Sequence, residues 1–151
     1  MIRLFILLII TLFSCNSRKQ ISPNSNVFLN SCKLISKTLL QQTDVWNTGS
    51  IDGFMKGYWQ SDSLKFITQR GIKFGYDSVA QSYKRNYNTP EKMGYLTFRN
   101  IMNYKTDDNY DVIQTTGNWH VKKTNSQDSG MFSLFFKQIK GEWKIIVDHT
   151  W

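Results

Sequence analysis

From Gly94 onward the chain alternates apolar and polar residues, and this two-residue period constrains the fold more than any other feature. Four such segments follow one another, at 95–104, 110–122, 130–140 and 142–150, and short polar stretches separate them. Alternation with period two is the pattern of half-buried β-strands, and short polar connections between such strands are typical of hairpins. The sequence therefore predicts a meander of four consecutive antiparallel strands.

The region before Gly94 has helical spacing instead. Apolar residues recur every three or four positions at Phe28, Cys32, Ile35, Leu39 and Trp46, with Gln42 as the one polar interruption. This stripe predicts a helix of about five turns that ends at Gly49, followed by a short helix capped by Ser50. We also expect a brief strand at 64–68 and a third helix at 77–87. Helices followed by a meander are characteristic of α+β domains, in which helices cover one face of a curved antiparallel sheet.

The amino-terminal residues carry a processing signal. Arg3 precedes an apolar run from Leu4 to Phe13, about half the roughly 20 residues that a membrane-spanning helix needs. The following Leu12-Phe13-Ser14-Cys15 resembles the lipobox of bacterial lipoproteins, in which the cysteine is acylated after cleavage. The alternatives are a plain secretory signal with an incidental Cys15, or a tethered hydrophobic arm.

These features predict three parts of the chain. Residues 1–14 form a signal peptide, residues 15–26 a lipidated Cys15 and a flexible polar tether, and residues 27–151 one folded domain. The protein is accordingly expected in the cell envelope, anchored to a membrane through its lipid and facing the periplasm or the cell exterior.

Charge and cysteine content narrow the partners further. The formal charge is +8, but Lys and Arg are scattered along the chain with no run longer than a pair, which is typical of a solvated surface. We therefore expect no nucleic-acid partner, and an anionic membrane surface fits the charge better. With only Cys15 and Cys32 present, we expect neither a metal site nor a disulfide scaffold, and no cofactor.

Five phrases in the sequence carry a family resemblance. They are Trp46-Asn47-Thr48-Gly49-Ser50 with Phe54 and Tyr58, Gly75-Tyr76-Asp77, Gly94-Tyr95-Leu96-Thr97-Phe98, Gly117-Asn118-Trp119, and the closing Gly141-Glu142-Trp143-Lys144-Ile145-Ile146-Val147-Asp148-His149-Thr150. Their order and spacing resemble the nuclear transport factor 2-like superfamily, and within it the SnoaL-like bacterial domains of unknown function. The resemblance implies a cone-shaped α+β fold, in which N-terminal helices pack on a strongly bent antiparallel sheet and leave a pocket at the wide end.

Relatives in this superfamily include a steroid isomerase, polyketide cyclases, a dehydratase and proteins that only bind, so the pocket and not the fold must indicate the function. Aromatic rings with polar tips suit a small apolar or aromatic ligand. The candidate ligand-binding residues are Trp46, Tyr58, Tyr83, Tyr87, Phe98, Trp119 and His149. The alternative is that most of these rings fill the core, and Trp46 and Trp143 are the strongest candidates for that role.

His149 is the candidate catalytic residue. Strict alternation in the last strand places it with Trp143 and Ile145 on the inner face, and places Asp148 on the outer face. The alternatives for His149 are a buried hydrogen-bonded residue or a dimer contact. Because no acid is placed firmly inside the cone, we favour a small-molecule-binding domain without catalysis, which the resemblance implies is a homodimer. The alternatives are a proton-transfer enzyme (isomerase, cyclase or dehydratase) using His149, and a structural interaction module.

Overall fold

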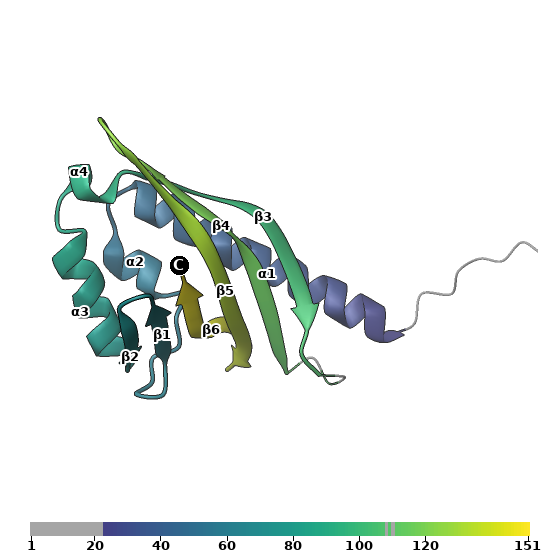
Figure 1. Ribbon diagram of the computed structural model, residues 1–151. Helices are drawn as coiled ribbons and strands as arrows, with labels where there is room; N and C mark the ends of the chain where they lie inside the picture. Colours follow the sequence, from purple (N-terminus) through teal and green to yellow (C-terminus); the bar gives the residue numbers. More distant parts are fainter. Residues whose placement is uncertain (1–22, 108, 110) are drawn as a thin grey trace, which may run out of the picture.

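The computed structural model describes residues 23–107, 109 and 111–151 (Figure 1). In this part of the chain the helices are α1 (Pro23–Asn47), α2 (Ile51–Met55), α3 (Tyr76–Asn86) and α4 (Pro90–Met93). The strands are β1 (Lys65–Thr68), β2 (Gly71–Phe74), β3 (Tyr95–Lys105), β4 (Val112–Lys122), β5 (Gln127–Ile139) and β6 (Glu142–Thr150). The predicted signal peptide, Cys15 and most of the predicted tether lie outside the described residues.

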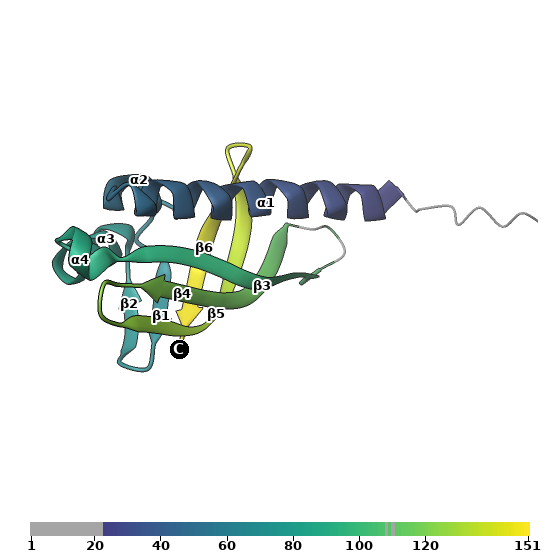
Figure 2. The same ribbon diagram turned by 90° about the horizontal axis from the view of Figure 1, so that it is seen from above.

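A single curved sheet organises the domain. Its strand order is β2-β1-β6-β5-β4-β3, and every neighbouring pair is antiparallel except β1 and β6, which are parallel. Helix α1 runs along one side of the sheet, while α2, α3 and α4 gather at one end of it (Figures 1 and 2). This arrangement confirms the predicted α+β class, with helices on a bent sheet and β3 to β6 as a hairpin-connected meander.

Helix α1 packs on the sheet through the predicted stripe. Ile35, Leu39 and Trp46 are almost fully buried, and Gln42 is buried with them. The polar interruption is satisfied, because the Gln42 amide Nε2 donates to the carbonyl of Phe54 at 3.1 Å. The helix begins at Pro23, so the last four residues of the predicted tether are helical, and proline is favourable in a first helical turn. No helix among the described residues is long and apolar enough to cross a membrane.

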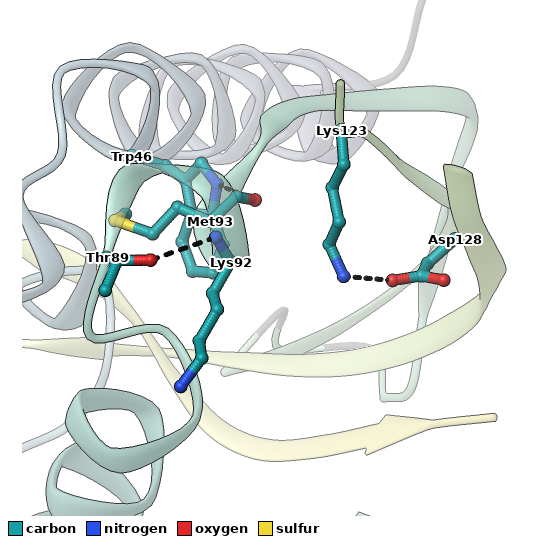
Figure 3. A network of polar contacts seen from close by, with 6 residues as sticks. All are labelled: Trp46, Thr89, Lys92, Met93, Lys123 and Asp128. Atoms are coloured by element: carbon teal, nitrogen blue, oxygen red, sulfur yellow. Dashed lines mark hydrogen bonds and ion pairs between the residues drawn. The ribbon is translucent and has the colours of Figure 1, made fainter. Parts of the chain in front are cut away.

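Two short elements were not predicted from the sequence. Strand β2 pairs with β1 at the sheet edge, and all four of its residues are exposed, so no alternation marks it. Helix α4 is a single turn whose first backbone N–H groups are capped by the Thr89 hydroxyl, which accepts from Lys92 N. The Trp46 indole donates to the Met93 carbonyl at 3.2 Å and so ties α4 to α1 (Figure 3).

Strand β6 contains a β-bulge that decides which side chains enter the cone. Its pairing with β5 shifts between Phe136↔Ile145 and Phe135↔Val147, which leaves Ile146 as an extra residue. An extra residue on one strand reverses the alternation beyond it. Trp143 and Ile145 therefore point inward before the bulge, and Asp148 points inward after it.

Candidate active site

A cavity of about 760 Å³ occupies the inside of the cone, between the inner face of the sheet and helices α1, α2 and α3. Six of the seven predicted ligand-binding residues line it: Trp46, Tyr58, Tyr83, Tyr87, Phe98 and Trp119. Their contact with a ligand remains a prediction. A volume of this size lies within the range of pockets that take small organic molecules.

His149 is the exception, and the inward orientation expected for it is wrong. It is exposed, it is not part of the cavity lining, and its ring packs against Trp151 with centroids 4.6 Å apart. The physical reason is the bulge at Ile146. After it, His149 pairs with Ser133 of β5, and both side chains lie on the outer face of the sheet. The structure therefore gives no geometric support to His149 as the acid or base in the cone.

Asp148 takes the inward position instead. It lies opposite Leu134 of β5 and Phe66 of β1, both of which line the cavity. Asp148 is only 5% exposed, although it lines the same cavity. The expectation that the cone holds no firmly placed acid is thus wrong as well.

The Asp148 carboxylate is held by a tyrosine pair. Tyr58 Oη donates to Asp148 Oδ2 at 2.7 Å, a normal length for a hydrogen bond from a hydroxyl. The Tyr83 hydroxyl lies 3.4 Å from that of Tyr58, which is long for this kind of hydrogen bond. Because the single Tyr58 proton goes to Asp148, the Tyr83 hydroxyl is the donor in this contact. The contact is so long that a ligand oxygen can compete for the Tyr83 proton.

Backbone contacts fix Tyr58 beside β6. Ile145 N donates to the Gly57 carbonyl at 2.9 Å, and Trp59 N donates to the Ile145 carbonyl at 3.0 Å. These bonds hold the segment after α2 along β6, just before the bulge. Glycine at position 57 leaves room for the Gln42 side chain, since a Cβ there would lie 2.5 Å from the Gln42 amide nitrogen and would displace the amide that donates to Phe54.

The surroundings set the charge states of these groups. Burial raises the pKa of Asp148 from 3.8 to about 7, and the hydrogen bond from Tyr58 opposes that rise. Burial, followed by the nearby Asp148 charge, raises the pKa of Tyr58 and of Tyr83 well above 10. At neutral pH the site therefore combines a carboxyl that can both accept and release a proton with two hydroxyls that remain donors.

Aromatic rings form a large part of the remaining wall, beside aliphatic and polar side chains. Tyr83 packs against Phe54 and Phe66 with ring centroids 5.2 and 5.7 Å away, and it stacks on Tyr87 at 5.8 Å. On the sheet, Trp119 pairs with Phe98 across β3 and β4. Beside this part of the wall, the ion pair between Lys123 and Asp128 joins the ends of β4 and β5 at 2.6 Å (Figure 3). Among the described residues, no three His, Cys, Asp or Glu side chains cluster in a way that could hold a metal ion.

We expect Tyr58→Phe to destabilise the protein more at pH 8 than at pH 5. The variant leaves the buried Asp148 carboxylate without its donor, and an unsatisfied buried group costs about 1–3 kcal/mol. The effect weakens at pH 5, where Asp148 is protonated. Urea unfolding at both pH values measures the difference, with the exposed Tyr95→Phe as control. Equal losses at the two pH values would contradict the assigned hydrogen bond.

The fold and the cavity define a cone-shaped α+β protein with an internal carboxyl. A protein from Shewanella oneidensis MR-1, described as nuclear transport factor 2-like and of unknown function, is 30% identical in sequence, with a TM-score of 0.74 over 80% of this chain and 98% of that one. The chain belongs to the nuclear transport factor 2-like superfamily.

More distant structures share the fold alone. A nuclear transport factor 2-like protein of unknown function from Pseudomonas putida KT2440 is 11% identical, with a TM-score of 0.66 over 81% of this chain and 86% of that one. A protein from Novosphingobium aromaticivorans DSM 12444, described as a candidate scytalone dehydratase, is 9% identical, with a TM-score of 0.66 over 83% of this chain and 86% of that one. A scan against protein-family models and a search of curated proteins gave no match.

Proposed function

We propose that the cone binds a small apolar or aromatic molecule and that Asp148 transfers a proton on it, as in an isomerase, cyclase or dehydratase. The observation that carries this proposal is the buried Asp148 carboxyl in the cavity wall, hydrogen-bonded by Tyr58. A general acid or base works best when its pKa lies near the working pH, and burial brings the pKa of Asp148 to about 7.

Each residue then has a distinct role. Asp148 removes a proton from the ligand and returns it at another position or to a leaving group. Tyr58 orients the carboxylate through its short hydrogen bond. Tyr83 donates to a ligand oxygen on which negative charge develops, since its hydroxyl is held only weakly by Tyr58. The aromatic wall excludes water and binds the apolar body.

Hydrogen exchange with solvent tests the proposal without a known substrate. The full chain is incubated in heavy water with a panel of small cyclic ketones and enones, and deuterium incorporation is followed by NMR. We expect the rate of incorporation to rise through a pH near 7, because the reaction requires the basic form of Asp148. Incorporation should be lost in Asp148→Asn and should persist in His149→Ala. Exchange that survives Asp148→Asn, or no exchange with any compound, would overturn the proposal.

Binding without catalysis is the second candidate. It is favoured by one observation, that Tyr58 already occupies one oxygen of the Asp148 carboxylate with a strong hydrogen bond. A tightly held carboxyl can be a structural or ligand-positioning group. The two candidates separate in the same experiment, since a purely binding cone retains ligands in both the wild-type and the Asp148→Asn protein but exchanges no hydrogen in either.

We further propose that the protein is an envelope lipoprotein anchored through Cys15 and that it forms a homodimer through the outer face of its sheet. The anchor is supported by the short apolar leader before Cys15. The dimer is supported by two exposed apolar side chains on that face, Met102 and Met131, which pair with the outward residues Thr116 and Asn118 of β4. Light scattering tests the dimer, since the measured mass should be about twice that of the protomer; a monomer mass would contradict it.

Replacing Cys15 with serine should move the protein from the membrane pellet to the soluble fraction, because serine cannot form the thioether that carries the lipid. Cys32→Ser is the matched control, since it also removes a thiol but lies in helix α1. Fractionation of cells expressing the two variants, with immunodetection, measures the distribution. Retention of Cys15→Ser in the pellet would contradict lipid anchoring at this residue.

A further inference from the structure

The mouth of the cavity carries a charge opposite to that of its interior. Arg70 lies in the turn between β1 and β2, Lys73 lies on β2, and Arg85 lies near the end of α3, and all three line the cavity. We refer to these three residues as the cationic mouth. They are exposed, so they stand where a ligand would enter.

In the part of the chain that the structure describes, no ion pair joins an acid to the cationic mouth. The ion pairs found among the described residues join Lys84 to Asp52, Lys123 to Asp128 and Lys144 to Glu142, and none includes a residue of the mouth. Asp148 is the one carboxyl among the described residues that line the cavity, and it is buried at the level of Phe66. The cations therefore remain available to an anionic group.

The turn that holds Arg70 is well ordered by local hydrogen bonds. The Thr68 hydroxyl accepts from Arg70 N at 3.1 Å and donates to the Gly71 carbonyl at 3.4 Å. Along β1, Phe66 lies beside Asp148 and Arg70 follows four residues later. Only Phe66 to Thr68 is extended strand, about 7 Å at roughly 3.3 Å per residue, and Arg70 follows in the turn, so Asp148 and Arg70 line the cavity at different levels.

From this arrangement we propose that the cone takes an anionic amphiphile, an apolar or aromatic body that ends in a carboxylate or a similar anion, with the anion on Arg70 and Arg85 and the body inside. The inference names the ligand class for the site of the proposed function and rests on that cavity. This ligand class accounts for cationic side chains at the entrance of a cavity that contains aromatic rings. The cations attract the anion from solution, and they orient the ligand so that its charged end stays at the entrance.

Paired probes test the proposal by calorimetry on the full chain. Naphthylacetate and its methyl ester share one apolar body and differ in charge. At pH 6, where Asp148 is mostly protonated, the anion should bind about tenfold more tightly than the ester, and added salt should reduce the difference. Arg70→Gln with Arg85→Gln should bring the two affinities within about twofold, while the ester binds as before.

Because the whole chain is strongly basic, removing any two positive charges could weaken the binding of an anion. The control variant therefore removes two positive charges away from the cavity. Arg99→Gln with Lys137→Gln changes two exposed residues of β3 and β5 that do not line the cavity, and the preference for the anion should persist. It should also persist in Asp148→Asn, which cannot transfer a proton, so loss of the preference and loss of catalysis are distinguishable.

Three results would overturn the proposal: equal affinity for anion and ester in the wild-type protein, no measurable binding of either probe, or equal effects of the mouth variant and the control variant. A fourth contrary result would come from binding to phosphatidylglycerol vesicles. If the mouth variant loses binding to these vesicles but binds naphthylacetate like the wild type, the cations face a membrane surface and not a ligand.

Discussion

Replacing Asp148 with asparagine should raise the free energy of unfolding at pH 8 by about 3–4 kcal/mol. The wild-type carboxyl must lose its proton inside the folded protein, where burial raises its pKa from 3.8 to about 7. Because one pH unit of such a difference corresponds to about 1.4 kcal/mol, ionising Asp148 destabilises the folded state by roughly 4 kcal/mol. Asparagine is uncharged and still accepts a hydrogen bond from Tyr58.

The sign of the pH dependence follows from the same pKa. Between pH 4 and pH 7 the folded protein holds a proton on Asp148 that the unfolded chain has lost, so this group makes stability fall as pH rises through that window. The Asp148→Asn variant should lose this part of the slope. Urea unfolding at pH 5 and pH 8 measures it, with exposed Asp44→Asn as control. A variant less stable than wild type at pH 8 would contradict a buried, destabilising charge.

Phe136→Ala should lower the free energy of unfolding by about 3–5 kcal/mol, whereas Phe135→Ala should lower it by only about 1 kcal/mol. Phe136 is fully buried on the inner face, opposite Ile113 and Ile145. Its neighbour Phe135 is half-buried and pairs with Val147 on the outer face. The two residues have identical side chains, so the comparison isolates which face of β5 lies in the core.

Urea unfolding of both variants at one pH provides the measurement. Equal losses, or a larger loss for Phe135→Ala, would show that β5 presents its other face to the core. That result would also invalidate the position of Asp148, because Leu134 and Asp148 are paired through the same register.

The architecture could be predicted from the sequence because periodicity reports burial directly. The stripe on α1 and the alternation in β3 to β6 arise from elements with one buried face, and the bounds expected for β6 agree with the structure. Strand β2 could not be predicted, since all its residues are exposed and it pairs along one edge only. Helix α4 is too short for a period to develop.

The site was predicted only in part, for a specific reason. Rings that line the cavity were found because aromatic residues are conspicuous on predicted inner faces. The acid was missed because one extra residue, Ile146, exchanges the faces of Asp148 and His149. A signal does exist, since Ile145, Ile146 and Val147 are three consecutive apolar residues in a strand that otherwise alternates, and such an interruption can mark a bulge.

The cationic mouth illustrates a different limit. Arg70 and Lys73 are close in sequence, but Arg85 lies on another element, and only the packing of α3 beside the β1–β2 hairpin brings the three to one entrance. The composition shows that the chain is basic, but it does not show where the positive side chains gather in the fold.

The most direct measurement is the titration of Asp148 itself. In protein labelled with ¹³C at the aspartate carboxyl carbons, the resonance that disappears in Asp148→Asn identifies this residue, and its chemical shift is followed from pH 3 to pH 9. The structure predicts an apparent pKa of about 7, which rises further in Tyr58→Phe. A midpoint near 4, the ordinary value for an exposed aspartate, would mean that the carboxyl faces water and that the cone has no internal acid.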